Sequence, residues 1–184
     1  MTGIVLLVVV VLLAVFVIRM YNRLVKLRVL ASNAWSDIDV QLKRRYDLVP
    51  NLVETVKGYA GHERATLENV TKARQQAVEL RGGTPAERAA AENALSQTLR
   101  SLFAVSENHP QLRANENFRD LQNTLESLED AIQNSRRYYN AVVRDYNTEI
   151  EVFPSNVVAN LFRFEQRQFF ELSEPERTAP KVQF

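Results

Sequence analysis

The stretch that decides the fold is residues 118–146, FRDLQNTLESLEDAIQNSRRYYNAVVRDY. The side chains of one stripe recur alternately three and four residues apart: Phe118, Leu121, Leu125, Leu128, Ile132, Ser135, Tyr139, Val142 and Tyr146. This heptad pattern is typical of a coiled coil or of a long bundle helix. A helix from about Leu112 to Val152 would extend roughly 60 Å, which favours an elongated bundle. We expect the stripe to pack inside one bundle, and pairing with a second copy of the bundle is the alternative.

Two helices are predicted upstream of this stretch, in the N-terminal half of the chain. The first runs from the N-terminal region to about Tyr46, and Asp47 can cap a second that reaches about Leu80. Pro50 is tolerated in a first turn, because the amides there have no intrahelical partner. One continuous helix with a kink at the proline is the alternative. The second helix should stop at Arg81-Gly82-Gly83.

A third helix has a clear start signal. Thr84, Pro85 and Glu87 form a capping box with proline at the preferred first position. This helix should run to about Glu107. Short turns make successive helices antiparallel, so the four helices predict an elongated up-down four-helix bundle over residues 21–152. The predicted fold class is therefore all-α.

Residues 1–20 are predicted to form a transmembrane helix that continues into the bundle. The first 18, MTGIVLLVVVVLLAVFVI, carry no charged side chain and approach the ~20 apolar residues that span a bilayer. Arg19 can extend toward the lipid headgroups, and Tyr21 suits the aromatic belt of the interface. A cleaved signal peptide is the alternative, but it requires a basic stretch before the apolar residues and small residues at the cleavage site. Neither feature is present.

The charges that follow the apolar stretch predict its orientation. Positive charge marks the cytoplasmic end of a membrane span. Residues 19–36 carry four positive charges and no negative one, and Asp37 is the first acidic residue. We therefore expect a single-pass membrane protein with the N-terminus outside and the bundle in the cytoplasm. Arg19 and Arg23 are expected to contact lipid headgroups.

The overall composition disfavours several classes of function. The chain has 23 basic and 22 acidic residues, which removes the electrostatic argument for nucleic-acid binding. It has no cysteine, which excludes disulfides and thiolate chemistry. Neither His62 nor His109 belongs to the Glu-x-x-His pair that a di-iron bundle requires. We therefore predict no catalytic, cofactor-binding or metal-binding residue.

Residues 153–172 are predicted to form a short, apolar, membrane-proximal helix and its continuation. Pro154 should end the fourth helix, and Ser155 or Asn156 should cap the short one. The apolar residues predicted to contact the membrane or a partner are Phe153, Val157, Val158, Leu161, Phe162 and Phe164. They either lie in the membrane interface or fold back to close the end of the bundle. Residues 173–184 are polar with two prolines and are predicted to be disordered.

Two local patterns exceed what a generic bundle requires. Residues 34–45, AWSDIDVQLKRR, should present mostly an exposed charged face beside a core stripe that contains Trp35 and Ile38. Tyr-Asn pairs at 139–140 and 146–147 are seven residues apart. We expect their tyrosines on the seam and their asparagines beside it, where buried amides fix the register between helices.

Taken together, these strings resemble the LemA family. The likeness is carried by YNxLV at 21–25, AWxxIDVQLKRRxDLVPNLV at 34–53, VKGYAxHE at 56–63 and FPSNxVA at 153–159, where x is any residue, together with the two Tyr-Asn pairs and Ile150. The resemblance implies a bacterial protein with an N-terminal anchor in the inner membrane and an antiparallel four-helix bundle. It implies no established catalytic activity or cofactor, and it suggests a setting near membrane-protein quality control or envelope stress.

The sequence therefore predicts a membrane-anchored interaction or scaffold protein that is not an enzyme. Its expected partners are the lipid bilayer and unidentified membrane or membrane-associated proteins. A structural homo-oligomer that assembles on the membrane or shapes it is one alternative. An unrecognised metal-dependent enzyme is the other.

Overall fold

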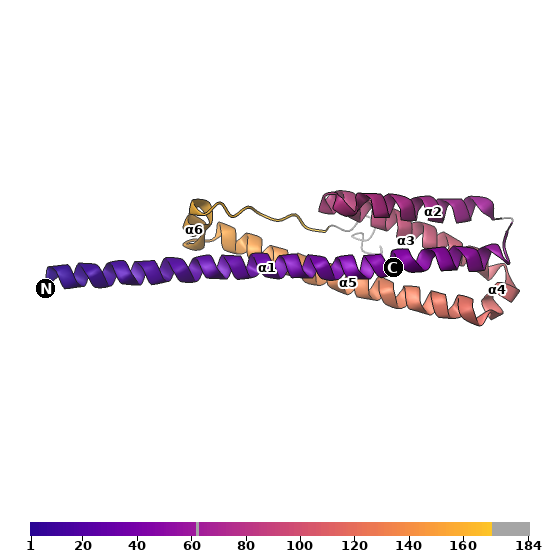
Figure 1. Ribbon diagram of the computed structural model, residues 1–184, viewed down its shortest axis with the longest axis horizontal. Coiled ribbons are helices and arrows are strands. Elements are labelled where there is room, and N and C mark those ends of the chain that lie inside the picture. Colours follow the sequence, from indigo (N-terminus) through magenta and orange to yellow (C-terminus); the bar gives the residue numbers. More distant parts are fainter. Residues whose placement is uncertain (62, 171–184) are drawn as a thin grey trace, which may run out of the picture. The chain divides into compact units, whose positions relative to one another are not determined.

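The computed structural model describes residues 1–61 and 63–170, and all regular structure in these ranges is helical. The helices are α1 (Thr2–Lys57), α2 (Arg64–Glu79), the 3-10 turn η1 (Leu80–Gly82), α3 (Pro85–Glu107), α4 (Pro110–Ala114), α5 (Glu116–Glu151) and α6 (Ser155–Leu161) (Figure 1). The predicted all-α class is therefore confirmed for the described residues. The predicted disorder of 173–184 and the last two residues of the predicted membrane-proximal segment 153–172 lie outside them.

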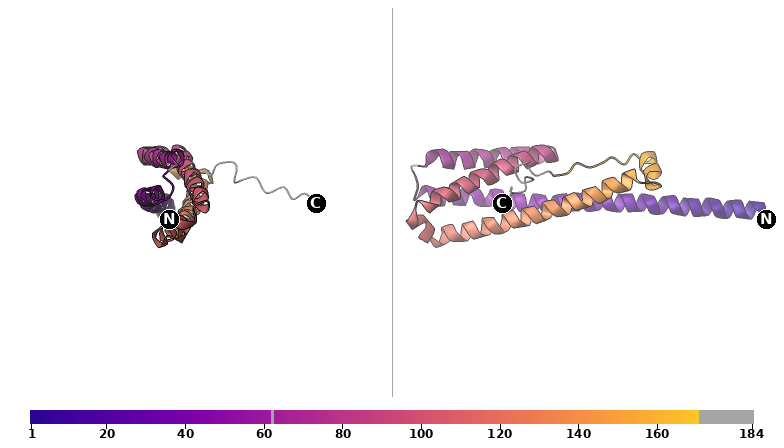
Figure 2. Two further views of the ribbon diagram at one scale, coloured as in Figure 1. Left: turned by 90° about the vertical axis from the view of Figure 1, so that its right-hand side faces the viewer. Right: turned by 180° about the vertical axis from the view of Figure 1, so that it is seen from behind.

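The chain divides into two compact units. The first unit combines Met1–Asp37 with Arg137–Gln168, and the second combines Ile38–Arg136 with the segment that begins at Phe169. Helices α1 and α5 each contribute one part to each unit. In the second unit, the corresponding parts of α1 and α5 lie alongside α2 and α3 (Figure 2). Each unit has its own buried interior, and the two interiors differ in chemistry.

Helix α1 does not end at Tyr46, so the predicted break before Asp47 is wrong and the continuous alternative holds. The Asp47 carboxylate accepts a hydrogen bond from Lys43 Nζ at 2.6 Å. Pro50 lies inside α1 and leaves the carbonyl of Tyr46 without its usual amide donor. Arg74 Nε of α2 donates to that carbonyl at 2.7 Å. The helix tolerates the proline because a neighbouring helix supplies the missing donor.

The connection between α1 and α2 comes later than predicted. Lys57 is the last residue of α1, and the amides of Tyr59 and Ala60 both donate to the carbonyl of Val56. Two glycines, Gly58 and Gly61, belong to this turn. Because glycine is a poor helix former, the turn forms here rather than at the well-packed residues before it.

The predicted start of α3 is confirmed. Thr84 Oγ1 accepts a hydrogen bond from the amide of Glu87, and the Glu87 carboxylate accepts one from the amide of Thr84 at 2.8 Å. Pro85 takes the first helical position, and Glu107 is the last residue, as predicted. The hydrogen bonds to Thr84 also lower the pKa of the Glu87 carboxyl group.

Helix α5 begins at Glu116, four residues later than predicted. The reason is Asn115, whose side-chain oxygen accepts a hydrogen bond from the amide of Phe118 at 2.9 Å and so caps the helix. Leu112 belongs to the separate short helix α4. The heptad stripe is largely buried within the chain, at Phe118, Leu125, Leu128, Ile132, Tyr139, Val142 and Tyr146.

The predicted short helix is present as α6, but it starts at Ser155, so the prediction that Ser155 or Asn156 caps it is wrong. Pro154 occupies the capping position, and Ser155 Oγ donates to the carbonyl of Val152 at 2.9 Å. The side-chain oxygen of Asn156 is buried without a hydrogen-bond partner among the described residues. Neither of these polar side chains therefore caps the helix, although the sequence favoured that role for both.

Candidate membrane-proximal site

Helix α1 contains the one described segment that is long and apolar enough to cross a membrane, judged by length and composition. Every side chain from Met1 to Phe16 is exposed. Val17 is the first that other parts of the first unit partly cover, and Leu24 is the first that they bury completely. The apolar end of α1 therefore has no protein neighbour among the described residues. Such a surface is typical of a segment that lies in lipid.

The first unit begins to pack at the point where this apolar stretch ends. Its buried cluster joins α1, α5, α6 and the chain after α6 through Leu24, Tyr146, Val158, Ala159 and Phe164. The partly buried residues packed around it are Val17, Met20, Tyr21, Val25, Leu27 and Ile150. The last residues of the apolar stretch therefore belong to this core.

Helix α6 presents one face to this core and another to the outside. Of the residues predicted to contact a membrane or partner, Val158 and Phe164 are buried in the cluster. The other four are exposed: Phe153, Val157, Leu161 and Phe162. Phe153 is 81% exposed and Leu161 is 71% exposed, which is unusual for such large apolar side chains. We call these four residues the α6 apolar patch.

Aromatic contacts connect the residues just after α6 to α1, beside the first cations of the chain. The ring of Tyr21 lies 4.8 Å from that of Phe162 and 5.7 Å from that of Phe164, measured between centroids. The Arg28 guanidinium lies 5.0 Å from the centroid of the Phe164 ring, within the range of a cation–π interaction. Tyr21 is thus a packing residue of the first unit as well as a residue of the predicted interface.

The two arginines predicted to contact headgroups are exposed. Arg19 has an exposed side chain. Arg23 pairs with Glu149 of α5 at 2.9 Å, and its side chain remains 69% exposed. A surface ion pair of this kind contributes about 0–1 kcal/mol, so Arg23 retains most of its capacity to interact with an anionic surface.

After α6 the chain turns back along the first unit. The turn is made at Arg163, whose φ of 54° lies in the left-handed region. The amide of Phe164 then donates to the carbonyl of Ala159 at 2.9 Å. We call residues 163–168 the strap.

Asn147 and Tyr139 hold the strap by its main chain. The side-chain amide of Asn147 accepts from the amide of Arg167 and donates to its carbonyl, both at 2.9 Å. The Tyr139 hydroxyl donates to the carbonyl of Gln168 at 2.9 Å, and the Arg167 guanidinium donates to Ser32 Oγ at 2.8 Å. Burial raises the pKa of Tyr139. The prediction that these Tyr-Asn pairs fix helix register is therefore wrong for Asn147, which binds the strap instead.

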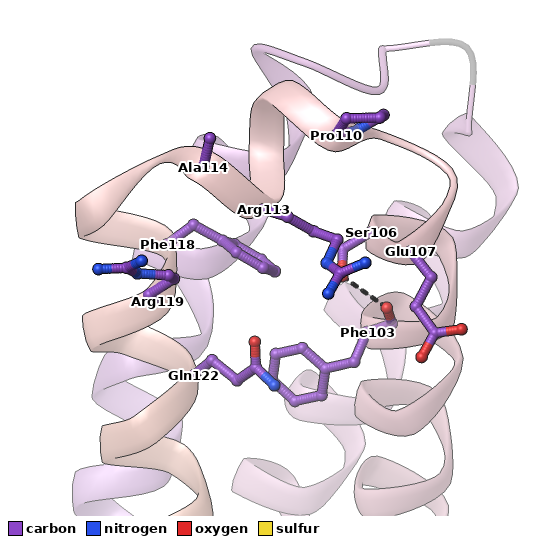
Figure 3. Close-up of a pocket in the computed structure, with 9 residues that line it drawn as sticks. All are labelled: Phe103, Ser106, Glu107, Pro110, Arg113, Ala114, Phe118, Arg119 and Gln122. Atoms are coloured by element: carbon purple, nitrogen blue, oxygen red, sulfur yellow. Dashed lines mark hydrogen bonds between the residues drawn. The ribbon is translucent and has the colours of Figure 1, made fainter.

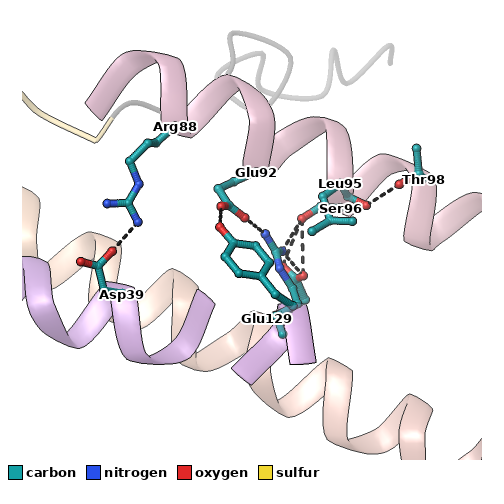
Figure 4. Close-up of polar contacts among 9 residues, drawn as sticks. Asp39, Arg88, Glu92, Leu95, Ser96, Thr98 and Glu129 are labelled. Carbon is teal, nitrogen blue, oxygen red and sulfur yellow. Dashed lines mark hydrogen bonds and ion pairs between the residues drawn. The ribbon is translucent and has the colours of Figure 1, made fainter. Parts of the chain in front are cut away.

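A cluster of polar side chains lies inside the second unit (Figure 4). Arg45 is 1% exposed and hydrogen-bonds to Glu92 of α3 and to Glu129 of α5. It also donates to Ser96 Oγ at 2.8 Å. The hydroxyl of Tyr46 donates to Glu92, which is itself 1% exposed. We call these residues the Arg45 cluster.

Opposing effects set the pKa of Arg45. Burial alone lowers that pKa, but the carboxylates of Glu129 and Glu92 outweigh burial and raise it above its usual value. Burial and the neighbouring Glu92 carboxylate likewise raise the pKa of Tyr46. Arg45 is therefore a permanent cation inside the unit.

The prediction that residues 34–45 form mostly an exposed charged face is wrong at Arg45, whereas the side chain of Asp39 remains 37% exposed. Arg45 is buried, and Asp39 pairs with the buried Arg88 of α3. A signal was present in the sequence, because Arg45 follows Leu42 by three residues and precedes Val49 by four. It therefore occupies a core position of the apolar stripe.

A pocket of about 590 Å³ lies where α3, α4 and α5 meet (Figure 3). Its lining includes the aromatic residues Phe103 and Phe118, the arginines Arg113 and Arg119, and Glu107. The mixed charges of this lining define no single class of ligand. Among the described residues, no group of three or more His, Asp or Glu side chains is arranged to hold a metal ion.

These features define a class of helical protein that carries one apolar helix able to cross a membrane. Comparison with known proteins is consistent with this class. The chain belongs to the LemA family, a family of membrane-associated proteins whose model matches residues 34–184. The resemblance seen in its sequence motifs is thereby confirmed.

Several curated relatives share this similarity. Magnetosome protein MamQ 2 of Paramagnetospirillum magneticum is 26% identical over 175 residues, which covers 82% of this chain and 64% of that protein. Magnetosome protein MamQ of Magnetospirillum gryphiswaldense is 23% identical over 174 residues, with the same coverage. Protein LemA of Metamycoplasma hominis is 26% identical over 148 residues, covering 79% of this chain and 66% of that protein. The chain thus spans slightly less than two thirds of the length of these relatives.

Proposed function

We propose that this protein is a membrane-anchored scaffold that binds other membrane or membrane-associated proteins and has no catalytic activity of its own. One observation carries the proposal. Helix α1 continues without a break from its bare apolar segment to Lys57, so the same helix supplies the anchor and part of both packed units. A scaffold benefits from such a connection because the first unit packs directly on the helix that carries the anchor, with no flexible linker between them.

The proposal includes an architecture and an orientation. The long helical segments of the second unit form an antiparallel up-down bundle, and the heptad stripe of α5 supports this arrangement. The four cations after the apolar stretch favour a bundle on the cytoplasmic side of the inner membrane, with the N-terminus outside.

Crosslinking in intact cells tests the scaffold proposal. A photoreactive amino acid is placed in the full chain at Leu30 or Val78, which are exposed apolar residues of α1 and α2. Discrete adducts with other proteins are expected from these sites. The matched control carries the same group at Leu95, which is fully buried in α3 and should give no adduct with another chain. Absence of adducts from every exposed site would refute the proposal.

A structural homo-oligomer on the membrane is the second candidate. The observation that favours it is the exposure of Val29, Leu30 and Val40 along α1, because self-association would cover these side chains. The same crosslinking experiment separates the two candidates. Adducts that contain only this chain, together with one sharp high-mass species on sedimentation in detergent, would favour the homo-oligomer over the scaffold.

The orientation has its own test. Protease added to spheroplasts should leave the helical units intact when they lie in the cytoplasm, and permeabilised cells serve as the control in which digestion proceeds. Complete digestion in intact spheroplasts would place the units outside and contradict the assignment from charge.

A further inference from the structure

We infer that α6 is a second membrane contact: it lies in the interface of the bilayer that α1 crosses, with the α6 apolar patch inserted among the lipid chains. This inference rests on the anchoring proposed above. The patch consists of Phe153, Val157, Leu161 and Phe162, all exposed in the first unit. The lipid surface is the occupant that the following observations favour.

The first observation is the depth at which α6 packs. Phe162, the residue that follows α6, contacts Tyr21 of α1, with ring centroids 4.8 Å apart. Tyr21 comes three residues after Ile18, the last residue of the uncharged stretch, and two after Arg19, the first cation. Two residues correspond to about 3 Å along a helix. The contact with Tyr21 therefore holds α6 at the level where the apolar span meets the headgroups.

The second observation is the direction of α6. Within the first unit, α6 crosses the direction of α1 instead of continuing along it (Figure 1). A helix that crosses a membrane-spanning helix at the boundary lies along the bilayer surface, as interfacial helices do. Val158 and Ala159 face the protein core, so the exposed side chains of α6 face away from it.

The third observation is the charge around the patch. Residues 152–162 contain no charged side chain, so their insertion carries no charge into the bilayer. Arg163 follows immediately, and Arg19 is exposed on α1. An uncharged apolar segment followed by Arg163, with Arg19 exposed on α1, matches an interface with acyl chains below and anionic headgroups above, and the exposed Glu151 precedes the segment. A protein partner would not require this order of apolar and basic residues along both segments.

Depth-dependent fluorescence quenching tests the inference directly. Trp35 is the only tryptophan, so Trp35→Phe gives a background without indole fluorescence. A single tryptophan is then introduced as Phe162→Trp or Leu161→Trp in the full chain. The purified protein is reconstituted into vesicles of phosphatidylcholine and phosphatidylglycerol whose acyl chains carry bromine near the headgroup or near the bilayer centre. Circular dichroism confirms that each variant keeps its helices.

Two control positions make the result decisive. Val78→Trp marks an exposed apolar site of α2 that should stay in water, and Phe16→Trp marks the apolar stretch of α1. Both α6 tryptophans should be quenched by the shallow bromines at least about twofold more than the Val78→Trp protein. If Phe16→Trp is quenched but both α6 tryptophans behave like Val78→Trp, the inference is overturned and the anchor stands. If Phe16→Trp itself is not quenched, the proposed anchoring fails, and the inference with it.

Discussion

The interiors of the two units are built on different chemistry. The first unit closes around an apolar and aromatic cluster, and the strap is tied over it by hydrogen bonds from Asn147 and Tyr139. The second unit buries apolar side chains too, but Arg45 and Glu92 lie among them almost without exposure. Apolar contacts tolerate small shifts, whereas buried ions require one geometry. We infer that buried ion pairs define the packing of the second unit. Apolar contacts and the hydrogen bonds to the strap define the packing of the first.

The largest expected effect comes from removing the cation of the Arg45 cluster. Arg45→Met leaves the Glu92 carboxylate buried without its main partner and should lower the free energy of unfolding by about 3–5 kcal/mol. Chemical denaturation in detergent measures this loss. The control is Arg44→Met, which changes the same residue type at an exposed neighbouring position and should cost less than about 0.5 kcal/mol.

A double variant then sharpens the interpretation. Combining Arg45→Met with Glu92→Leu removes both buried charges and should recover part of the stability lost in Arg45→Met. If the double variant recovers none of the lost stability, the ion pair between Arg45 and Glu92 does not define the packing of the second unit.

The strap gives the next largest effect. In Asn147→Asp, the side chain can still accept the Arg167 amide hydrogen bond, but it can no longer donate to the Arg167 carbonyl. The expected cost is about 1–3 kcal/mol. Hydrogen exchange should show faster exchange at the strap amides, with little change in α2 and α3. Asn123→Asp, at an exposed position of α5, is the matched control and should leave strap exchange unchanged.

A smaller effect is expected at the start of α3. Thr84→Ala removes the hydroxyl that accepts from the Glu87 amide and donates to the Glu87 carboxylate at 2.9 Å, and it should cost about 1 kcal/mol. The pKa of Glu87 is lowered in the folded protein, so its contribution is present above the ordinary carboxyl pKa and is lost as the pH falls. Thermal unfolding at neutral and acidic pH measures this. The difference between Thr84→Ala and the parent should shrink in acid; a constant difference would contradict a contribution from the bond between the Thr84 hydroxyl and the Glu87 carboxylate.

The last effect appears only at alkaline pH, where buried tyrosines ionise, and has no consequence at neutral pH. The pKa values of Tyr46, Tyr139 and Tyr146 are raised, mainly because burial disfavours the charged phenolate. Their contribution to stability is complete below the unfolded tyrosine pKa of about 10 and is lost as the pH rises above it. Ultraviolet absorbance should show delayed ionisation in the folded protein, and Tyr139→Phe should remove one delayed group. Uniform ionisation near pH ~10 would contradict the burial of these hydroxyls.

The parts of the fold that could be predicted from sequence are those with local causes. The capping box at Thr84 and the heptad stripe of α5 each depend on residues within a few turns. The predicted break at Asp47 was wrong because the donor that compensates Pro50 is Arg74, on another helix. No local pattern reveals such a donor.

The candidate site shows the same limit. The apolar character of residues 153–164 was visible in the sequence, but the division into a buried face at Val158 and an exposed patch was not, because it depends on where Tyr21 and Tyr146 lie. The role of Asn147 also depends on a segment 20 residues away. Arg45 is different, since its place in the apolar stripe could have revealed its burial.

The way Asn147 and Tyr139 hold the strap has a consequence for sequence variation and for protein engineering. Both side chains bind main-chain amide and carbonyl groups, which every residue except proline provides in full. These hydrogen bonds therefore constrain the route of the main chain at Arg167 and Gln168 and require no particular side chain there, whereas Phe164 remains constrained by its place in the buried cluster. A reporter group attached at the exposed Glu165 should be carried without loosening the strap, which makes this position a convenient place to label the first unit.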